Sequence, residues 1–227
     1  MKIVTAIPVK EFPKDSKEIR DDVLHLANTP LHQPSLCSKL NSALEWAKEQ
    51  GADWLCFHHN DLEIQTPELV EPNLRRAEVD GVRVAGVIGA LAMHVPQWWM
   101  CCRPLQTAGA IIQGYKDGHE QLMADQPGYN PNMAIVDGCI LWIHKDMFDV
   151  RVNEYGMHLY DDDICVRALE RGYKVAVLDV RCKHLSEGGY DYRPYQDASD
   201  RFMEYWRARA EFPIISGQRF HEPKEAK

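Results

Sequence analysis

The sequence predicts a single α/β domain in which a mostly parallel central sheet is flanked by helices. Short apolar runs alternate with helical patterns along the chain, which is typical of this class. Polar residues follow several of these runs, at the strand ends where open α/β sheets bind ligands. The 227 residues suit one large domain. We expect that domain to span residues 1–212, with residues 213–227 as a loose C-terminal tail.

The elements are predicted from apolar periodicity and from start and stop residues. Ser35 is expected to cap a helix that ends before Gly51, and Thr66 is expected to cap a helix with Pro67 in its first turn. Residues 90–133 are rich in Gly, Pro and Trp and are expected to be irregular, apart from one strand. In chain order we predict strands over 2–8, 23–27 and 54–57, strands over 82–89, 110–115, 134–144 and 175–178, and helices over 35–50, 66–79, 145–150, 164–171 and 198–210.

Composition and charge narrow the classes of function. Hydrophobic residues make up 45% and charged residues 26% of the chain, as in soluble globular proteins. No apolar run is long enough to span a membrane, and the N-terminal run is too short for a signal peptide. A net charge of −8 argues against a nucleic-acid partner. Among seven cysteines, Cys56, Cys139 and Cys165 lie in apolar runs without any Cys-x-x-Cys pair. We therefore expect a cytoplasmic protein with reduced core cysteines.

The stretch from Trp54 to Ile64 joins an apolar run to a His-x-Asp pair. Residues 54–57 have the pattern of a buried strand, and His59 and Asp61 follow its end. If the chain stays extended there, both side chains point to the same side and can meet one divalent cation. The alternative is that both residues belong to a loop that turns the chain and binds water.

Three further clusters of polar residues lie at predicted strand ends or helix starts. Asp137 is followed by Gly138, which lets backbone or ligand approach closely. Asp161 and Asp163 belong to an acidic run at a helix start, where they can instead cap the helix and favour its dipole. His184 follows an apolar strand and can alternatively be an ordinary hydrogen-bonded histidine.

Together these clusters favour a divalent metal site. Two histidines and several aspartates at strand ends suit Mn²⁺ or Mg²⁺ bound by nitrogen and oxygen. The lack of paired cysteines argues against structural zinc. A cation with open positions can hold a diphosphate, which would let an acidic protein bind an acidic substrate.

The clusters resemble, in order and spacing, the motifs of GT-A-fold glycosyltransferases of the family 2 type. The resemblance covers about residues 53–207. No single motif is specific, but five in order are a strong signal. Position 160 is Tyr, whereas most members have an acidic residue there. The matching segments are FHHNDL at 57–62, VDG at 136–138, YDDDICVR at 160–167, KHLSEG at 183–188 and RFMEYW at 201–206.

The resemblance implies a Rossmann-like GT-A fold and roles for five of these residues. Asp61 and His59 would bind the divalent ion that bridges the diphosphate of a nucleotide-sugar. His184 would complete the metal site or touch a phosphate. Asp161 would be the general base for the acceptor hydroxyl, and Asp163 would hold the site by hydrogen bonds or by capping the helix.

The resemblance also implies a set of substrate-binding residues. Asp137 and Gly138 would contact the donor sugar or the acceptor, and the tryptophans would stack on sugar faces, although a buried core position is the commoner role for Trp. The second strand of the family usually ends in an acid that helps to read the base, and Asp22 or Asn28 are the candidates here. The expected substrate-binding residues are Pro8, Asn28, Asn60, Asp137, Gly138, Trp98, Trp99 and Trp142.

The expected function is therefore metal-dependent, inverting transfer of a sugar from a nucleotide-sugar donor to a saccharide or other hydroxyl acceptor. One alternative is a homologue that binds a nucleotide or sugar without catalysis. Another is a metal-dependent nucleotidyltransferase or hydrolase built on a similar sheet.

Overall fold

The computed structural model describes residues 1–9, 22–27, 35–96, 101, 106–115, 117–185 and 192–221. Residues 10–21 and the predicted substrate-binding residues Asn28, Trp98 and Trp99 lie outside these ranges.

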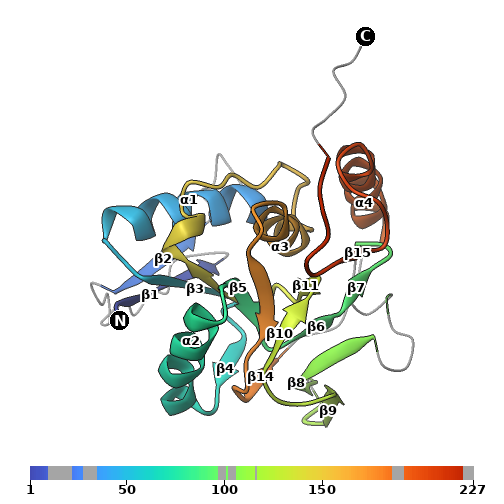
Figure 1. Ribbon diagram of the computed structural model, residues 1–227. Coiled ribbons are helices and arrows are strands. Elements are labelled where there is room, and N and C mark those ends of the chain that lie inside the picture. Colours follow the sequence, from blue (N-terminus) through green and yellow to red (C-terminus); the bar gives the residue numbers. More distant parts are fainter. Residues whose placement is uncertain are drawn as a thin grey trace.

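A seven-stranded sheet forms the centre of the α/β fold (Figure 1). Its strand β3 is a continuous apolar run buried on both faces, as a central strand requires. Strand β2, which had only a short apolar pattern to indicate it, is confirmed with the predicted bounds. In sheet order the strands are β10 (Asn130–Met133), β13 (Lys174–Val177), β5 (Val82–Gly86), β12 (Ile140–His144), β3 (Trp54–His58), β1 (Ile3–Val9) and β2 (Val23–Ala27).

The central sheet is mixed, and this corrects the prediction of a mostly parallel one. β12 lies between β3 and β5 and is antiparallel to both, and β10 is antiparallel to β13 at the sheet edge. The pairs β1–β2, β1–β3 and β5–β13 are parallel. All five residues of β12 are buried, and a continuous apolar run has the same pattern in either direction.

Helices cover both faces of this sheet. Figure 1 shows α1 (Leu36–Glu49) and α3 (Tyr160–Glu170) side by side on one face, and α2 (Val70–Val79) on the other. The Ser35 hydroxyl accepts a hydrogen bond from the Ser38 amide, which confirms the predicted cap of α1. Short 3₁₀ turns occupy Pro67–Leu69 and Lys145–Met147.

A second, six-stranded sheet occupies much of the segment that was predicted to be irregular. Its strand β8 confirms and extends the strand predicted over 110–115. The prediction of irregular structure was wrong for residues 120–125 and 130–133, which form strands whose largely polar sequences lack an apolar pattern. The strands run in the order β11 (Ile135–Val136), β6 (Ile88–Ala90), β8 (Thr107–Gly114), β14 (Cys182–His184) and β4 (Leu62–Ile64), with β9 (Glu120–Asp125) paired to β8.

The C-terminal region packs beside these two sheets. Helix α4 spans Tyr192–Arg207. The predicted start was Ala198, so the helix begins six residues earlier than expected. The expected tail begins with β15 (Ile214–Ile215), which pairs with β7 (Ala92–Met93) and buries Ile214. No helix in the described ranges has both the length and the apolarity that a membrane span requires.

The core contains large side chains from the central sheet and from helix α4. Trp54, Phe57 and Trp142 from the central sheet and Trp206 from α4 are fully buried. Six cysteines of the described chain are buried with free thiols. Burial raises the pKa of these thiols, as for Cys56 and Cys139, so they behave as apolar core residues.

Candidate metal centre and active site

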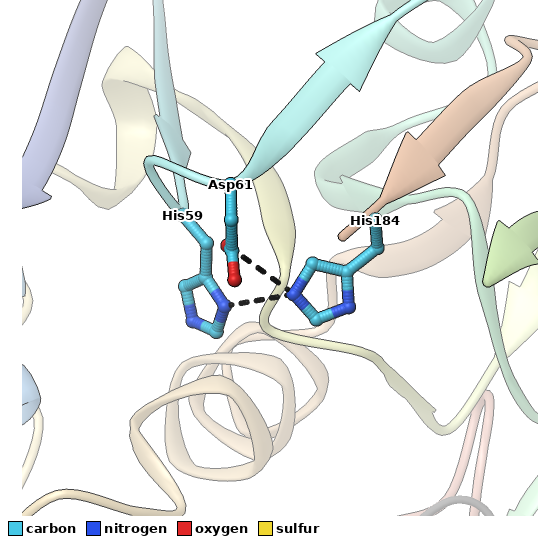
Figure 2. Close-up of side chains that lie close together, drawn as sticks. All are labelled: His59, Asp61 and His184. Atoms are coloured by element: carbon cyan, nitrogen blue, oxygen red, sulfur yellow. Dashed lines mark hydrogen bonds and ion pairs between the residues drawn. The ribbon is translucent and has the colours of Figure 1, made fainter. Parts of the chain in front are cut away.

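His59, Asp61 and His184 form a compact group at the junction of the two sheets. One ligand atom from each residue lies within 4.8 Å of the others. His184 Nε2 is 3.5 Å from His59 Nδ1 and 3.4 Å from Asp61 Oδ1. Figure 2 shows the three side chains pointing toward one common space, His59 and Asp61 from the turn between β3 and β4 and His184 from β14. We call this group the His-Asp-His triad.

Two local features bring the triad together. A tight turn joins β3 to β4, and within it the Leu62 amide donates to the carbonyl of His59. The chain is therefore not extended from His59 to Asp61 but turns, as the alternative had it, and the turn itself makes the two side chains converge. β14 then pairs antiparallel with β4, so that His184 lies opposite Leu62 and next to Asp61. This pairing spans residues far apart in the sequence.

The side-chain nitrogen and oxygen atoms of the triad suit a divalent cation. Asp61 Oδ1 is buried and has no hydrogen-bond partner, although it forms an ion pair with His184. A buried carboxylate oxygen without a hydrogen bond costs free energy unless a positive group lies nearby. Two imidazole nitrogens and one carboxylate oxygen are a ligand set that Mn²⁺, Fe²⁺, Co²⁺ or Zn²⁺ accepts. The three residues can therefore hold such an ion.

Electrostatics within the triad follow from burial and mutual contact. Burial, reinforced by the charge of His184, lowers the pKa of His59. Burial also opposes charge on His184, but contact with Asp61 outweighs it and raises the pKa of His184. Burial likewise opposes the Asp61 charge, but His184 outweighs it and lowers the pKa of Asp61. Without a cation, Asp61 and His184 therefore behave as an ion pair, and a bound cation would displace a proton.

Asp161 lies in the first turn of α3, next to the glycine of the Asp137-Gly138 motif. Its Oδ2 accepts a hydrogen bond of 2.8 Å from the Gly138 amide, while the N-cap position of α3 is Leu159. Burial, together with the like charge of Asp137, raises the pKa of Asp161 to about 7. A half-buried carboxylate with a pKa near neutrality is suited to accept a proton at physiological pH.

Gly138 is required here by space. A Cβ atom at this position would lie 2.5 Å from the Tyr160 hydroxyl oxygen and 2.8 Å from Asp161 Oδ2. The carboxylate of Asp137 accepts a hydrogen bond from the Cys139 amide at 2.8 Å. The motif therefore combines a close approach at Gly138 with a fixed negative charge at Asp137.

Tyr160 joins His59 of the triad to Asp161 through Gly138, a role that the sequence did not predict. Its hydroxyl donates to the Gly138 carbonyl at 2.7 Å and lies 2.9 Å from His59 Nε2. The ring is buried and packs edge-on against Phe57. A tyrosine in place of the usual acid at the start of α3 was the signal that could have identified it.

Asp163 is fully buried and faces away from the triad into the contact between α3 and α4. It accepts hydrogen bonds from the Arg167 guanidinium at 2.7 Å and from the Trp206 indole at 2.9 Å. The Asn153 amide and the Tyr155 hydroxyl donate to it as well. Four donors on one carboxylate anchor α3, the preceding loop and α4 to one another.

The remaining predicted site residues are dispersed. Asn60 is exposed at the tip of the turn between β3 and β4, and Pro8 is buried in β1 beside Leu26. The expectation that Trp142 stacks on a sugar is wrong, because its side chain is fully buried between β3 and β5. A sugar face cannot reach a ring that neighbouring strands enclose.

Comparisons with known proteins show weak likeness in fold. No family model matches the chain, and no curated protein matches it. The crystal structure of A197 from STIV superposes with a TM-score of 0.46 and 10% identity, over 82% of this chain and 87% of that chain. A CMP:2-keto-3-deoxy-manno-octonic acid synthetase complexed with CTP superposes with a TM-score of 0.40 and 11% identity, over 90% of this chain and 100% of that chain. At these values the resemblance to GT-A glycosyltransferases rests on the sequence motifs alone.

Proposed function

We propose that the protein is a divalent-metal-dependent glycosyltransferase that moves a sugar from a nucleotide-sugar to a hydroxyl acceptor with inversion. One observation carries this proposal. A triad suited to a cation and a carboxylate with a pKa of about 7 are joined by three successive hydrogen bonds through Tyr160 and Gly138. The order of the sequence motifs supports the same assignment.

The triad would hold the cation and, through it, the donor diphosphate. When bound, a divalent ion offsets the negative charge that develops on a nucleoside diphosphate as it leaves. His59 and His184 would supply neutral nitrogen ligands, so Asp61 would be the one negatively charged ligand of the triad. A triad with so little negative charge of its own leaves the cation able to attract an anionic donor.

Asp161 would act on the acceptor. Its carboxylate takes the proton of the acceptor hydroxyl while the hydroxyl oxygen forms a bond to the anomeric carbon of the donor. The bond between that carbon and the diphosphate oxygen breaks, and the electron pair leaves with the nucleoside diphosphate. A single displacement of this kind inverts the anomeric configuration. Asp137 has a second effect, because its charge helps to keep the pKa of Asp161 high enough for proton transfer.

Asp163 would be a positioning residue rather than a group that touches substrate. Its four hydrogen bonds are all to protein groups, and the side chain is fully buried. By anchoring α3 it holds the first turn that carries Asp161. We propose Asp137, Gly138 and Asn60 as substrate-contacting residues. Gly138 lies beside the first turn of α3 with Asp137 next to it in the chain, and Asn60 lies in the turn after β3.

The test is release of nucleoside diphosphate from a panel of nucleotide-sugars and hydroxyl acceptors, with Mn²⁺ and with chelator. We expect metal-dependent turnover that Asp61→Asn and Asp161→Asn each reduce by at least about 100-fold. Asp53→Asn is the matched control. That residue precedes β3 at its opposite end and bonds to Lys145, so activity should be unchanged.

Three outcomes would contradict the proposal. Full activity in Asp161→Asn would remove the base assignment. Release of pyrophosphate from a nucleoside triphosphate and a sugar would indicate a nucleotidyltransferase instead. Tight binding of nucleoside diphosphates without turnover across the whole panel would indicate a binding protein.

A further inference from the structure

Three hydrogen bonds connect a metal ligand to the proposed base across the start of α3. His59 Nε2 lies 2.9 Å from the Tyr160 hydroxyl oxygen, and that hydroxyl donates to the Gly138 carbonyl at 2.7 Å. The Gly138 amide donates to Asp161 at 2.8 Å. Since all three contacts have ordinary hydrogen-bond lengths, each must have one donor and one acceptor.

Proton counting then determines the form of the His59 ring. A tyrosine hydroxyl has one proton, and Tyr160 gives it to the Gly138 carbonyl, which cannot donate. The hydroxyl oxygen can therefore only accept from His59, so Nε2 must carry a proton. A neutral imidazole has a single N–H, which leaves Nδ1 with a free lone pair. That atom is the one that lies 3.5 Å from His184 Nε2 within the triad.

The surroundings of Tyr160 hold this arrangement in place. The ring is 4% exposed and packs edge-on against Phe57, with centroids 5.7 Å apart. Gly138 leaves no space for the hydroxyl to move toward it, since even one added carbon would lie 2.5 Å from the oxygen. Leu159, the preceding residue, adopts φ of 65°, a left-handed conformation that costs about 1–3 kcal/mol and starts α3 at this point.

We propose that Tyr160 is a positioning residue that selects the Nε2–H tautomer of His59, presents Nδ1 to the cation, and ties the metal centre to Asp161 through Gly138. This inference rests on the metal-dependent function proposed above. The partner of a histidine's second nitrogen normally sets its tautomer and orientation at metal sites. The usual partner of the second nitrogen is a carboxylate or a backbone carbonyl. Here the partner is the Tyr160 hydroxyl, which can only accept from His59 because it donates its proton to the Gly138 carbonyl.

The simpler alternative is that Tyr160 only satisfies a buried carbonyl. Tyr160→Phe removes the hydroxyl and keeps the packing against Phe57, so it separates the two roles. The matched control is Tyr195→Phe, because Tyr195 is also buried and its hydroxyl also donates to a backbone carbonyl, that of Pro96, at 2.8 Å. Both variants lose a hydrogen bond to a backbone carbonyl, and Tyr160→Phe alone also loses the hydrogen bond with His59 of the triad.

The first measurement is the affinity for Mn²⁺ and Zn²⁺ by titration calorimetry, without donor or acceptor. We expect Tyr160→Phe to bind about 10- to 100-fold more weakly than wild type, and Tyr195→Phe to bind within about 2-fold. Equal affinities in the two variants would overturn the inference, because a merely structural role predicts no difference between them.

The second measurement determines the tautomer of His59 directly in the wild-type protein. In the metal-free wild-type protein at about pH 8, long-range ¹H–¹⁵N spectra of the imidazole rings report which nitrogen carries the proton, with His59→Gln for assignment. We expect the proton on Nε2 of His59, and a mixture of tautomers in Tyr160→Phe. A proton on Nδ1 in wild type would overturn the inference. Failure of sugar transfer with the expected affinity and spectrum would count against the proposed function alone.

Discussion

Replacing Asp161 by Asn should stabilise the metal-free protein at high pH while it removes the proposed base. The carboxyl has a pKa of about 7 in the folded chain, against an ordinary value of 3.8. Between about pH 4 and pH 7 the folded state therefore holds a proton that the unfolded state releases. Stability falls as the pH rises through this window, and the full cost is present above pH 7. An amide at this position carries no such cost.

The structure sets the size of the effect. The difference between 3.8 and about 7 corresponds to about 4 kcal/mol at 1.4 kcal/mol per pH unit, of which about 2–3 kcal/mol falls between pH 5 and pH 8. The Asn oxygen can still accept from the Gly138 amide, but a neutral acceptor is weaker by about 1 kcal/mol. We expect the variant to be about 3 kcal/mol more stable than wild type at pH 8, and within about 1 kcal/mol of wild type at pH 5.

The assay is urea denaturation of wild type and Asp161→Asn at pH 5 and pH 8 in the presence of a chelator, because a bound cation would itself lower the pKa of Asp161. Asp53→Asn provides a control of opposite sign. Its hydrogen bonds to Lys145 and to the Lys2 amide lower the pKa of Asp53, so it stabilises the fold above its unfolded pKa and that stability is lost as the pH falls. This substitution should destabilise the protein at pH 8.

One result would refute the reasoning about Asp161. If the difference in unfolding free energy between wild type and Asp161→Asn is the same at pH 5 and pH 8, the carboxyl does not have a raised pKa in the folded chain. Burial and the Asp137 charge would then not act on it as argued, and its suitability as a base at neutral pH would lose its physical support.

Three further predictions concern the site and its supports. Because His59 and His184 offer nitrogen, Mn²⁺, Co²⁺ and Zn²⁺ should raise the melting temperature in thermal-shift experiments and Mg²⁺ should have little effect; an equal shift with Mg²⁺ would contradict the ligand set. Gly138→Ala should cost about 1–3 kcal/mol in urea denaturation, since its Cβ would lie 2.5 Å from the Tyr160 oxygen, and a loss below about 0.5 kcal/mol would show that the ring can move away. Asp163→Ala should cost about 3–5 kcal/mol, because the guanidinium paired with it is left largely buried, and near-wild-type stability would count against this anchor.

Local elements could be predicted from the sequence because short-range physics specifies them. The run Trp54 to Phe57 forms a strand since an apolar run of that length is stable only when buried on both faces. The Ser35 cap and the stop at Gly51, with φ of 60°, set the bounds of α1. The acidic residues 161–163 begin a helix whose dipole favours them.

Several expectations failed where long-range pairing determines the outcome. The direction of β12 is not encoded in its apolar pattern, so the mixed sheet could not be anticipated. Trp142 was expected at a sugar, but its position between two strands buries it completely. Strand β9 was not predicted, because it has exposed residues on both faces and its sequence lacks the alternation by which strands are recognised.

The chain's residue types alone thus determined that His59, Asp61 and His184 are candidates for one cation and that Asp161 is a candidate base. The tertiary structure decided how they meet. The pairing of β14 with β4 brings together histidines 125 positions apart, and a turn rather than an extended strand aims Asp61 at them. Tyr160 gains its role only because α3 places its hydroxyl between His59 and the Gly138 carbonyl. Hydrogen bonds and burial between distant segments set these contacts, and no local pattern in the sequence encodes them.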